Sequence, residues 1–399
     1  MPDKLKIVSD RKDVSAFAAI PELRKQKFAE ALPSPVSSNF AVNSVAALLH
    51  PSSQTLVVSG VEEAGRDVRK YTLVPDETRG TASLAVFRPG QYLSFTLAIG
   101  QAVVSRPYTI CSSPKAALED RYEVLIRRHP NGFVSPYIFA NWGVGTQVTA
   151  SAPMGPYHQP IRDGKNVVAV CDTRGVSPFL SMAQAICDGS MDVHMTLLYA
   201  CRKRADAVAV ARLEELSAET DRFRVVYVFS DETVDGCERG FVTKNILEKY
   251  APRTRYSVFI CGSTALYNRL SEQLLAMRLE RKYVRFGYNG QITDPSVIPG
   301  FPPEAVGQTY LCKIIRGGEP ARIIHCRAQE SVLTALEREG LAVPSSCRSG
   351  ECGFCRARLT KGNVFMPRNV DSRRVADSAH GVIHPCCSYP MSDLTIVLD

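Results

Sequence analysis

The sequence lacks several features that mark specialised classes of protein. No apolar run approaches the roughly 18 residues that a membrane-spanning helix requires, so we expect no membrane span. No apolar stretch follows the first residues, Met1–Lys6, so we expect no secretory signal and a cytoplasmic location. The net charge of +8 is spread along the chain, with no block of about five or six like charges. It is therefore only a weak indication of a nucleic-acid partner, and we expect none.

The length and composition are those of a multi-domain globular protein. The chain has 399 residues, of which 45% are hydrophobic and 22% are charged, which excludes a disordered chain. At roughly 100–200 residues per domain, two or three domains are expected. Changes of pattern along the chain predict a helical leader at 1–39, an all-β barrel domain at 40–160, a doubly wound α/β domain at 161–288, a linker at 289–307 and a cysteine-rich domain at 308–399.

The spacing of apolar residues supports this division. Between residues 14 and 32 they recur at helical spacing, and Pro21 limits where this helix can start. Short runs such as Tyr92–Leu97, separated by Gly and Pro turns, indicate many short strands and therefore a barrel. After residue 160, buried strands such as Asn166–Val170 alternate with helices, which is typical of a doubly wound domain. The last domain is expected to contain a hairpin (310–315 with 321–325), a helix (331–339) and a final strand (393–398).

Cysteine is concentrated near the C-terminus. Seven of the 13 cysteines lie after residue 307, and in a chain without an export signal this favours a metal site over disulfides. Three of them follow the spacing C-x4-C-x2-C, and a pair follows about thirty residues later, which is the plant-type spacing for a [2Fe–2S] cluster. The predicted ligands are Cys347, Cys352, Cys355 and one of the adjacent Cys386 and Cys387.

A tetrahedral zinc site is the competing interpretation of these cysteines. Zinc sites usually pair two C-x2-C knuckles, and this region has one, so the cluster is favoured. A short loop containing Gly350 and Gly353 would let the backbone wrap closely round a cluster, with amide N–H groups facing its sulfurs.

Two segments of the region resemble plant-type ferredoxins. These are Ser346–Cys355, which reads SCRSGECGFC, and Pro385–Asp393, which reads PCCSYPMSD. Ferredoxins of this type carry their last ligand three residues before a Tyr-Pro or similar pair, so alignment on Tyr389 makes Cys386 the fourth ligand. The resemblance implies a β-grasp ferredoxin domain. It leaves Cys387, Cys312 and Cys326 as structural thiols.

A second group of functional residues lies at the end of a β-run, where the chain reads Arg106-Pro107-Tyr108-Thr109. A guanidinium can bind a diphosphate, an aromatic ring can cover a planar apolar face, and a hydroxyl can meet a ring nitrogen. An exposed strand with an isolated arginine is the alternative interpretation. Downstream, the predicted start of a helix would offer free N–H groups as a second phosphate site. The residues at that start are Gly132, Val134 and Ser135, and Gly155 then ends the barrel.

In sequence these motifs read R-x-Y-[ST], G-x-x-S and G-P, and they resemble the ferredoxin–NADP reductase superfamily over residues 40–288. The resemblance implies a barrel that binds FAD or FMN and an α/β domain that binds NAD(P)H. It implies that Arg106 and Pro107 hold the flavin, that Tyr108 covers its ring system and that Thr109 lies near N5. The Ile110–Pro114 extension and Ser135 resemble members that bind FAD, so FAD is expected.

The nucleotide loops match the family only in part. The family's first loop reads G-G-[TS]-G-[IV]-[TAS]-P, whereas Asp172–Pro178 reads DTRGVSP, with a carboxylate where pyrophosphate would approach the backbone. Arg174 can offset that charge by pairing with phosphate or with Asp172. The second loop, Cys261-Gly262, matches, and the resemblance places its cysteine near the nicotinamide. The implied nucleotide-binding residues are Arg174, Gly175, Ser177, Pro178 and Gly262.

The choice between NADH and NADPH is narrow. The basic run Arg202–Arg204 would suit a 2′-phosphate, whereas Asp231 at the end of the next strand favours free ribose hydroxyls, and we favour NADH.

Two functions fit these residues. The favoured one is a reductase that passes electrons from NADH or NADPH through FAD to a [2Fe–2S] cluster and on to a terminal redox protein, an oxygenase or another reductase. Flavin belongs between the other two groups because it accepts electron pairs and releases single electrons. The alternative is an electron-transfer subunit whose altered nucleotide site no longer uses NAD(P)H and which relays electrons between proteins.

Overall fold

The computed structural model describes residues 11–30, 40–277, 279–287, 290, 292, 294–368 and 370–398. The rest of the expected leader (1–10 and 31–39) and linker positions 289, 291 and 293 lie outside the described residues. The chain divides into two units, Met1–Ala47 and Leu48–Asp399, and each is described by itself.

The first unit is helical. Helix α1 (Arg11–Glu30) confirms the expected helix, but Pro21 lies inside it, so the expectation that Pro21 limits its start was wrong. Phe17 and Phe28 on this helix are 77% and 80% exposed. A second helix, α2 (Ala41–Leu49), occupies residues where an all-β pattern was expected. Its sequence, AVNSVAALL, is rich in Ala and Leu, which have the highest helix propensities. None of the helices in the described part of the chain has the length and apolar character needed to cross a membrane.

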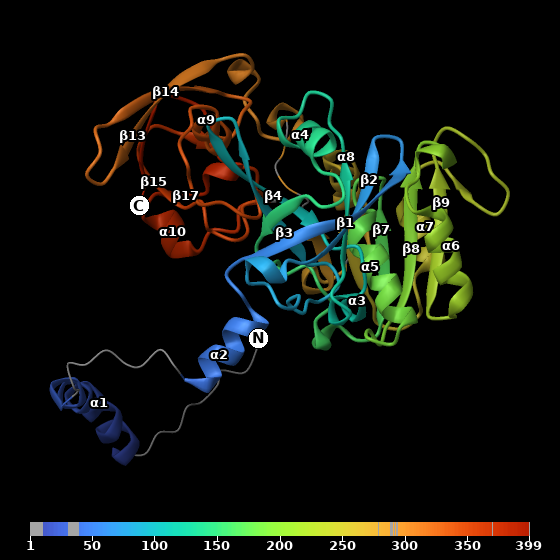
Figure 1. The fold of residues 1–399 in the computed structure, drawn as a ribbon, viewed down its shortest axis with the longest axis horizontal. Coiled ribbons are helices and arrows are strands. Elements are labelled where there is room, and N and C mark those ends of the chain that lie inside the picture. Colours follow the sequence, from blue (N-terminus) through green and yellow to red (C-terminus); the bar gives the residue numbers. More distant parts are fainter. Residues whose placement is uncertain are drawn as a thin grey trace. The chain divides into compact units, whose positions relative to one another are not determined.

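The barrel domain, of which Figure 1 labels strands β1 to β4, is a six-stranded antiparallel sheet in the order β4-β3-β6-β1-β2-β5. A bridge between Ile110 and Val124 joins the end of β4 to β5 across the barrel. Alternate residues of β5 are buried: Tyr122, Val124 and Ile126 are fully inside. The strands are β1 (Gln54–Gly65), β2 (Val68–Pro75), β3 (Tyr92–Ile99), β4 (Ala102–Thr109), β5 (Tyr122–Arg127) and β6 (Gln147–Ala150), with helices α3 (Pro114–Leu118) and α4 (Val134–Asn141) between them.

The second domain within the unit Leu48–Asp399 is a parallel sheet in the order β10-β9-β8-β7-β11-β12. The strand order reverses between β7 and β11, so the loops after these two strands lie together at the switch point, where α/β sheets bind ligands. Its strands are β7 (Asn166–Cys171), β8 (His194–Cys201), β9 (Phe223–Phe229), β10 (Glu238–Arg239), β11 (Ser257–Cys261) and β12 (Val284–Gly287). Its helices are α5 (Val176–Cys187), α6 (Val210–Glu219), α7 (Lys244–Tyr250) and α8 (Thr264–Ala276).

The C-terminal domain is a mixed five-stranded sheet in the order β14-β13-β19-β15-β17. The hairpin, the helix and the final strand expected here are all present, and β13 pairs in parallel with β19 as in a β-grasp fold. Its elements are β13 (Thr309–Arg316), β14 (Arg322–Arg327), α9 (Val332–Arg338), β15 (Ala357–Lys361), β16 (Val364–Phe365), α10 (Val375–Ala379), β17 (Val382–Ile383), β18 (Tyr389–Pro390) and β19 (Leu394–Leu398).

The described part of the linker packs against this last domain. Phe301 is buried and meets the ring of Phe365 edge-to-face at 5.3 Å. The Tyr389 hydroxyl donates a hydrogen bond to the carbonyl of Ile292 at 2.9 Å. These contacts limit how far the domain can move from the rest of the unit.

Two glycines give a matched test of the close packing where the barrel meets the α/β domain. Gly90 and Gly100 both have positive φ, at 102° and 60°. A Cβ at Gly90 would lie 1.8 Å from the Tyr157 carbonyl oxygen, whereas one at Gly100 would meet nothing within 4 Å. We expect Gly100→Ala to cost about 1–2 kcal/mol of unfolding free energy from left-handed strain alone. We expect Gly90→Ala to cost about 1–3 kcal/mol more because of the overlap. Chemical denaturation measures both, and equal losses would contradict the packing described here.

Candidate functional site

The cysteine loop between α9 and β15 has the features that a [2Fe–2S] cluster requires. Cys347, Cys355 and Cys386 are at most 2% exposed, and Cys352 is partly exposed. The Cys347 sulfur accepts hydrogen bonds from the backbone N–H of Ser349 at 3.4 Å and of Cys352 at 3.3 Å. These amide–sulfur contacts match the expectation that the loop turns its N–H groups toward the cluster sulfurs. Four buried or half-buried thiols with amide donors therefore fit the cluster.

The thiols also lie within reach of one another. The pKa of Cys347 is lowered chiefly by hydrogen bonds from Cys352 and Cys386. The pKa of Cys355 is lowered chiefly by a hydrogen bond from Cys386. Among the described residues, no three Cys, His, Asp or Glu side chains surround a single point at metal-ligand distance. A two-iron cluster does not require such a point, because each iron takes only two protein thiolates.

The geometry separates the two adjacent candidates for the fourth ligand. The Cys386 thiol lies against those of Cys347 and Cys355 as well as against that of its neighbour Cys387. The Cys387 thiol instead donates to the His384 carbonyl at 3.5 Å. This arrangement favours Cys386, as the resemblance to ferredoxins implied.

Gly350 is required by the packing of this loop. Its φ is +81°, and a Cβ would lie 2.3 Å from the Val370 carbonyl oxygen and 2.8 Å from the Cys387 sulfur. Any side chain here would therefore push the loop away from the segment that carries Cys386 and Cys387.

The flavin motif lies on β4, an edge strand of the barrel sheet. Tyr108 packs on the barrel core, with its ring centroid 6.0 Å from that of Phe95, and burial raises the pKa of its hydroxyl. Arg106 is 22% exposed, and its guanidinium donates to the Ser105 carbonyl at 2.7 Å. The pKa of Arg106 is lowered to about 10, first by burial and then by the charge of Arg348, with Glu337 acting in the opposite direction.

Tyr92 is a site residue that the sequence reasoning missed. In the β3–β4 register it lies directly opposite Thr109, and Pro107 lies opposite Ser94. The pKa of Tyr92 is raised mainly by burial and then by the Cys347 and Cys352 thiols, so its hydroxyl faces the cysteine loop. A ring beside the flavin strand therefore also borders the cluster loop.

The other predicted flavin residues lie at two turns of the barrel domain. Helix α4 begins at Val134, and the Ser135 hydroxyl accepts the backbone N–H of His129 at 2.9 Å while keeping its own proton to donate. A Cβ at Gly132 would lie 3.4 Å from that hydroxyl. At Gly155 a Cβ would lie 2.8 Å from the Tyr92 ring, so this glycine lets the backbone pass beneath the ring.

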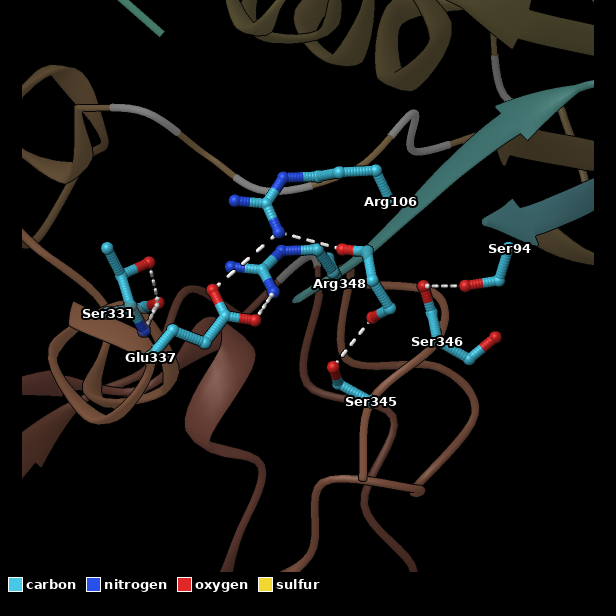
Figure 2. Close-up of polar contacts among 9 residues, drawn as sticks. Ser94, Arg106, Ser331, Glu337, Ser345, Ser346 and Arg348 are labelled. Atoms are coloured by element: carbon cyan, nitrogen blue, oxygen red, sulfur yellow. Dashed lines mark hydrogen bonds and ion pairs between the residues drawn. The ribbon is translucent and has the colours of Figure 1, made fainter. Parts of the chain in front are cut away.

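The cysteine loop contacts β3 and β4, called here the flavin strands because β4 carries the predicted flavin motif (Figure 2). The Ser94 hydroxyl donates to the Ser346 carbonyl at 3.3 Å, and the Ser105 and Ser345 hydroxyls share a hydrogen bond of 2.6 Å. Ser345 and Ser346 immediately precede Cys347, a predicted cluster ligand. The two predicted cofactor sites are thus joined by hydrogen bonds across about 250 residues of sequence, with separations of 252 and 240 residues.

The nucleotide loops meet at the switch point, and Asp172 joins them. One carboxylate oxygen accepts the N–H of Arg174 at 2.9 Å, and the other accepts the N–H of Ser263 at 2.8 Å. Backbone N–H groups of this kind are the usual anchors of a nucleotide pyrophosphate. Asp172 therefore supplies an internal anion to both loops, an arrangement that the sequence reasoning did not foresee.

The remaining nucleotide-site residues are close to these two loops. A Cβ at Gly175 would lie 1.8 Å from the Cys261 carbonyl oxygen, so this glycine permits contact between the loops. Ser177 and Pro178 are buried in α5, and Cys261 is fully buried in the core of the domain. A pocket of about 330 Å³ adjoins the loops and is lined by Asp172, Arg174, Ser263, Thr264, Ala265, Ile292, Asp294 and Val297.

Comparisons with known families match each of the three domains. The oxidoreductase FAD-binding domain matches residues 55–158, the oxidoreductase NAD-binding domain matches 170–272, and the 2Fe-2S iron-sulfur cluster binding domain matches 318–391. The three matches occur in the order in which the structure presents the barrel, the parallel sheet and the cysteine loop.

Relatives and solved structures share this arrangement over most of the chain. The glycine betaine monooxygenase reductase subunit of Chromohalobacter salexigens is 26% identical, over 83% of this chain and 91% of its own. The ferredoxin reductase component of 3-ketosteroid-9-alpha-monooxygenase from Mycolicibacterium smegmatis is 27% identical, over 85% and 94%.

Phthalate dioxygenase reductase has the same fold, with a TM-score of 0.62 and 22% identity over 87% of this chain and 98% of that one. The fold, the order of the three domain matches and the relatives that match more than four fifths of the chain all indicate the same arrangement of domains. The chain has the fold of the ferredoxin–NADP reductases and carries, in order, an oxidoreductase FAD-binding domain, an oxidoreductase NAD-binding domain and a C-terminal 2Fe-2S cluster binding domain.

Proposed function

We propose that this chain is the reductase component of an oxygenase system, taking electrons from a nicotinamide nucleotide and delivering them to a separate terminal oxygenase. The observation that carries the proposal is the docking of the cysteine loop on the flavin strands through Ser94, Ser105, Ser345 and Ser346. Electron transfer between two groups needs proximity, and this contact brings the two predicted sites together within one chain.

Each domain contributes a separate part of the chemistry. When bound, FAD accepts electrons in pairs from the nucleotide and passes them singly to the cluster. Arg106 offers a charge-assisted contact to the flavin diphosphate, Tyr108 forms an apolar wall, and Thr109 offers a hydroxyl opposite Tyr92. Cys347, Cys352, Cys355 and Cys386 hold the cluster.

The cysteine loop also reaches the surface, where a partner can collect electrons. Phe354, next to Cys355, is 55% exposed, whereas Ser346, next to Cys347, is buried. One end of the loop thus faces the flavin strands and the other faces solvent. We assign the exposed end to the terminal oxygenase.

A cytoplasmic location is part of the proposal. None of the 13 cysteines, all of which lie among the described residues, forms a disulfide. Many cysteines without disulfides are typical of a reducing compartment.

The second candidate function is an electron-transfer subunit, or conduit, that relays electrons between proteins without using a nucleotide. The position of Asp172 is the observation that favours it. Its carboxylate already occupies the N–H groups of Arg174 and Ser263. Anaerobic mixing with NADH and with NADPH, followed at the flavin absorbance, separates the two functions. We expect reduction by NADH; no reduction by either nucleotide would leave the conduit.

The cluster assignment predicts the outcome of single cysteine substitutions. Protein purified without air should contain about two irons per chain with acid-labile sulfide. Cys347→Ser, Cys352→Ser, Cys355→Ser and Cys386→Ser should lose or badly alter the cluster while keeping the flavin, because each removes a thiolate from an iron. Cys387→Ser is the matched control and should keep both irons, since the Cys387 thiol donates a hydrogen bond to the His384 carbonyl. Iron analysis and the visible spectrum report the result, and loss in Cys387→Ser with retention in Cys386→Ser would move the ligand by one position.

The flavin assignment predicts weaker cofactor binding in Arg106→Ala. The substitution removes a charge-assisted contact to phosphate, worth about 1.5–3 kcal/mol, or about a 10- to 150-fold increase in the dissociation constant. Fluorescence titration of the deflavinated protein measures the change. Mass spectrometry of the cofactor released from unmodified protein should identify FAD, and FMN alone would refute the choice of flavin.

The nucleotide loops predict opposite effects of two neighbouring substitutions. Arg174→Ala should raise the KM for NADH, since a cation beside the diphosphate is lost, and should leave reduction of the cluster by dithionite unchanged. Asp172→Asn should lower the KM, because it removes the negative charge that competes with phosphate for the two N–H groups while keeping the shape of the side chain. Steady-state kinetics with NADH decides, and a raised KM in Asp172→Asn would show that the carboxylate organises the loops rather than opposing the nucleotide.

A further inference from the structure

A buried carboxylate joins the flavin strand to the cluster loop. One oxygen of Glu337 accepts from the Arg348 guanidinium at 2.5 Å, and its other oxygen lies 3.6 Å from a guanidinium nitrogen of Arg106. Arg348 directly follows the ligand Cys347, whereas Arg106 lies on β4 in the barrel domain. Figure 2 shows both guanidinium groups turned toward the same carboxylate.

The three side chains are shielded from water, which makes their charges matter. The side chains of Arg348 and Glu337 are 1% and 6% exposed, and that of Arg106 is 22% exposed. A buried ion needs a partner because desolvation is costly, so removal of one partner leaves a heavy penalty on the others. Two cations share one anion here, and the group carries one excess positive charge.

The position of Glu337 is fixed by its helix. The Ser331 hydroxyl accepts the N–H of Thr334 at 3.2 Å and caps the start of α9, and Glu337 lies in the last turn of that helix. The hydrogen bonds of Ser346 to Ser94 on β3 and of Ser345 to Ser105 on β4 hold the loop beside these two strands. The carboxylate therefore reaches both cations from a rigid base, and Arg106 is the member that belongs to the other domain.

We propose that Glu337 is a positioning residue that holds the cluster loop against the flavin strand by pairing Arg106 and Arg348 at once, and that it competes with the flavin diphosphate for Arg106. This inference rests on the proposed function, in which Arg106 binds the diphosphate. Flavin binding and docking of the ferredoxin domain are then energetically coupled, since both draw on the same guanidinium.

Glu337→Gln tests the inference because it removes the charge and keeps the shape. Loss of the competing anion should tighten FAD binding to the deflavinated protein by about fivefold, which is at the low end of typical coupling between sites. The flavin-to-cluster step, followed by anaerobic stopped-flow after reduction with NADH, should slow by about tenfold or more because the loop is less well placed. A misfolded variant would weaken binding and slow the step together, so the opposite signs distinguish positioning from a general structural defect.

Glu330→Gln is the matched control. Glu330 is a half-buried acid of the same domain, and it pairs with Arg338 at 2.9 Å within that domain. It should leave both the FAD affinity and the flavin-to-cluster step unchanged. Hydrogen exchange should also show faster exchange in the peptide covering residues 94–109 for Glu337→Gln and not for the control.

A double variant keeps the test decisive if Glu337→Gln fails to take up a cluster. Glu337→Met with Arg348→Met replaces the buried pair by apolar side chains, a change that buried ion pairs often tolerate. It should retain the cluster and still show the slow flavin-to-cluster step. A normal rate in a cluster-containing variant, or FAD affinity equal to that of the control, would overturn the inference. Failure of the proposed function is distinguishable, because it would abolish flavin reduction by NADH and leave the FAD titration readable.

Discussion

The contact between the cluster loop and strands β3 and β4 is the constraint on which the rest of the structure depends. Hydroxyls on those strands bond the two residues that precede Cys347, and the flavin motif lies on the same strand as one of those hydroxyls. An electron donor and its acceptor must remain close to each other. Because the contact is made by the residues directly before Cys347, it fixes the distance between the flavin strands and the predicted cluster site. The linker packing of Phe301 and Ile292 against the same domain restricts its freedom further.

Anion recognition is the second theme, because at two places a carboxylate contacts groups that were predicted to bind phosphate. Asp172 takes the N–H groups of two nucleotide loops, and Glu337 takes the arginine of the flavin motif. Asp172 accepts hydrogen bonds from two backbone N–H groups, and Glu337 pairs with two guanidinium groups that are largely shielded from water. If phosphate binds at these places, it must displace the carboxylate or share the same cations and N–H groups with it. Phosphate binding is then weaker than these cations and N–H groups alone would give. Such a cost makes ligand affinity adjustable by one side chain at each site.

The order of the domains and the motifs of the candidate site could be predicted from local patterns in the sequence, because these signals are short in range. The C-x4-C-x2-C spacing, the R-x-Y-T strand and the alternation of strands and helices are each contained within a few turns of chain. The place of Tyr92 could also have been predicted. Gly100 and Gln101 form the turn of the β3–β4 hairpin, and counting residues back from this turn pairs Tyr92 with Thr109. The contacts of Glu337 with Arg106 and of Asp172 with Ser263 were not within reach, because they join segments 231 and 91 residues apart through tertiary packing. Helix α2 was missed for the opposite reason: the strand pattern was extended over a short segment whose own propensity is helical.

Fusion of donor and ferredoxin in one chain changes what the surface of the ferredoxin domain must do. A free ferredoxin has to find its donor by diffusion, and free plant-type ferredoxins are commonly acidic. Residues 308–399 carry 12 Lys and Arg against 9 Asp and Glu, a net charge of +3. With the donor attached, its effective concentration is set by the linker and electrostatic steering toward it is unnecessary. The buried end of the cluster loop can therefore be specialised for the flavin strand through hydroxyls and a shared carboxylate. The exposed end with Phe354, and the charges around it, can be adapted to the acceptor protein alone.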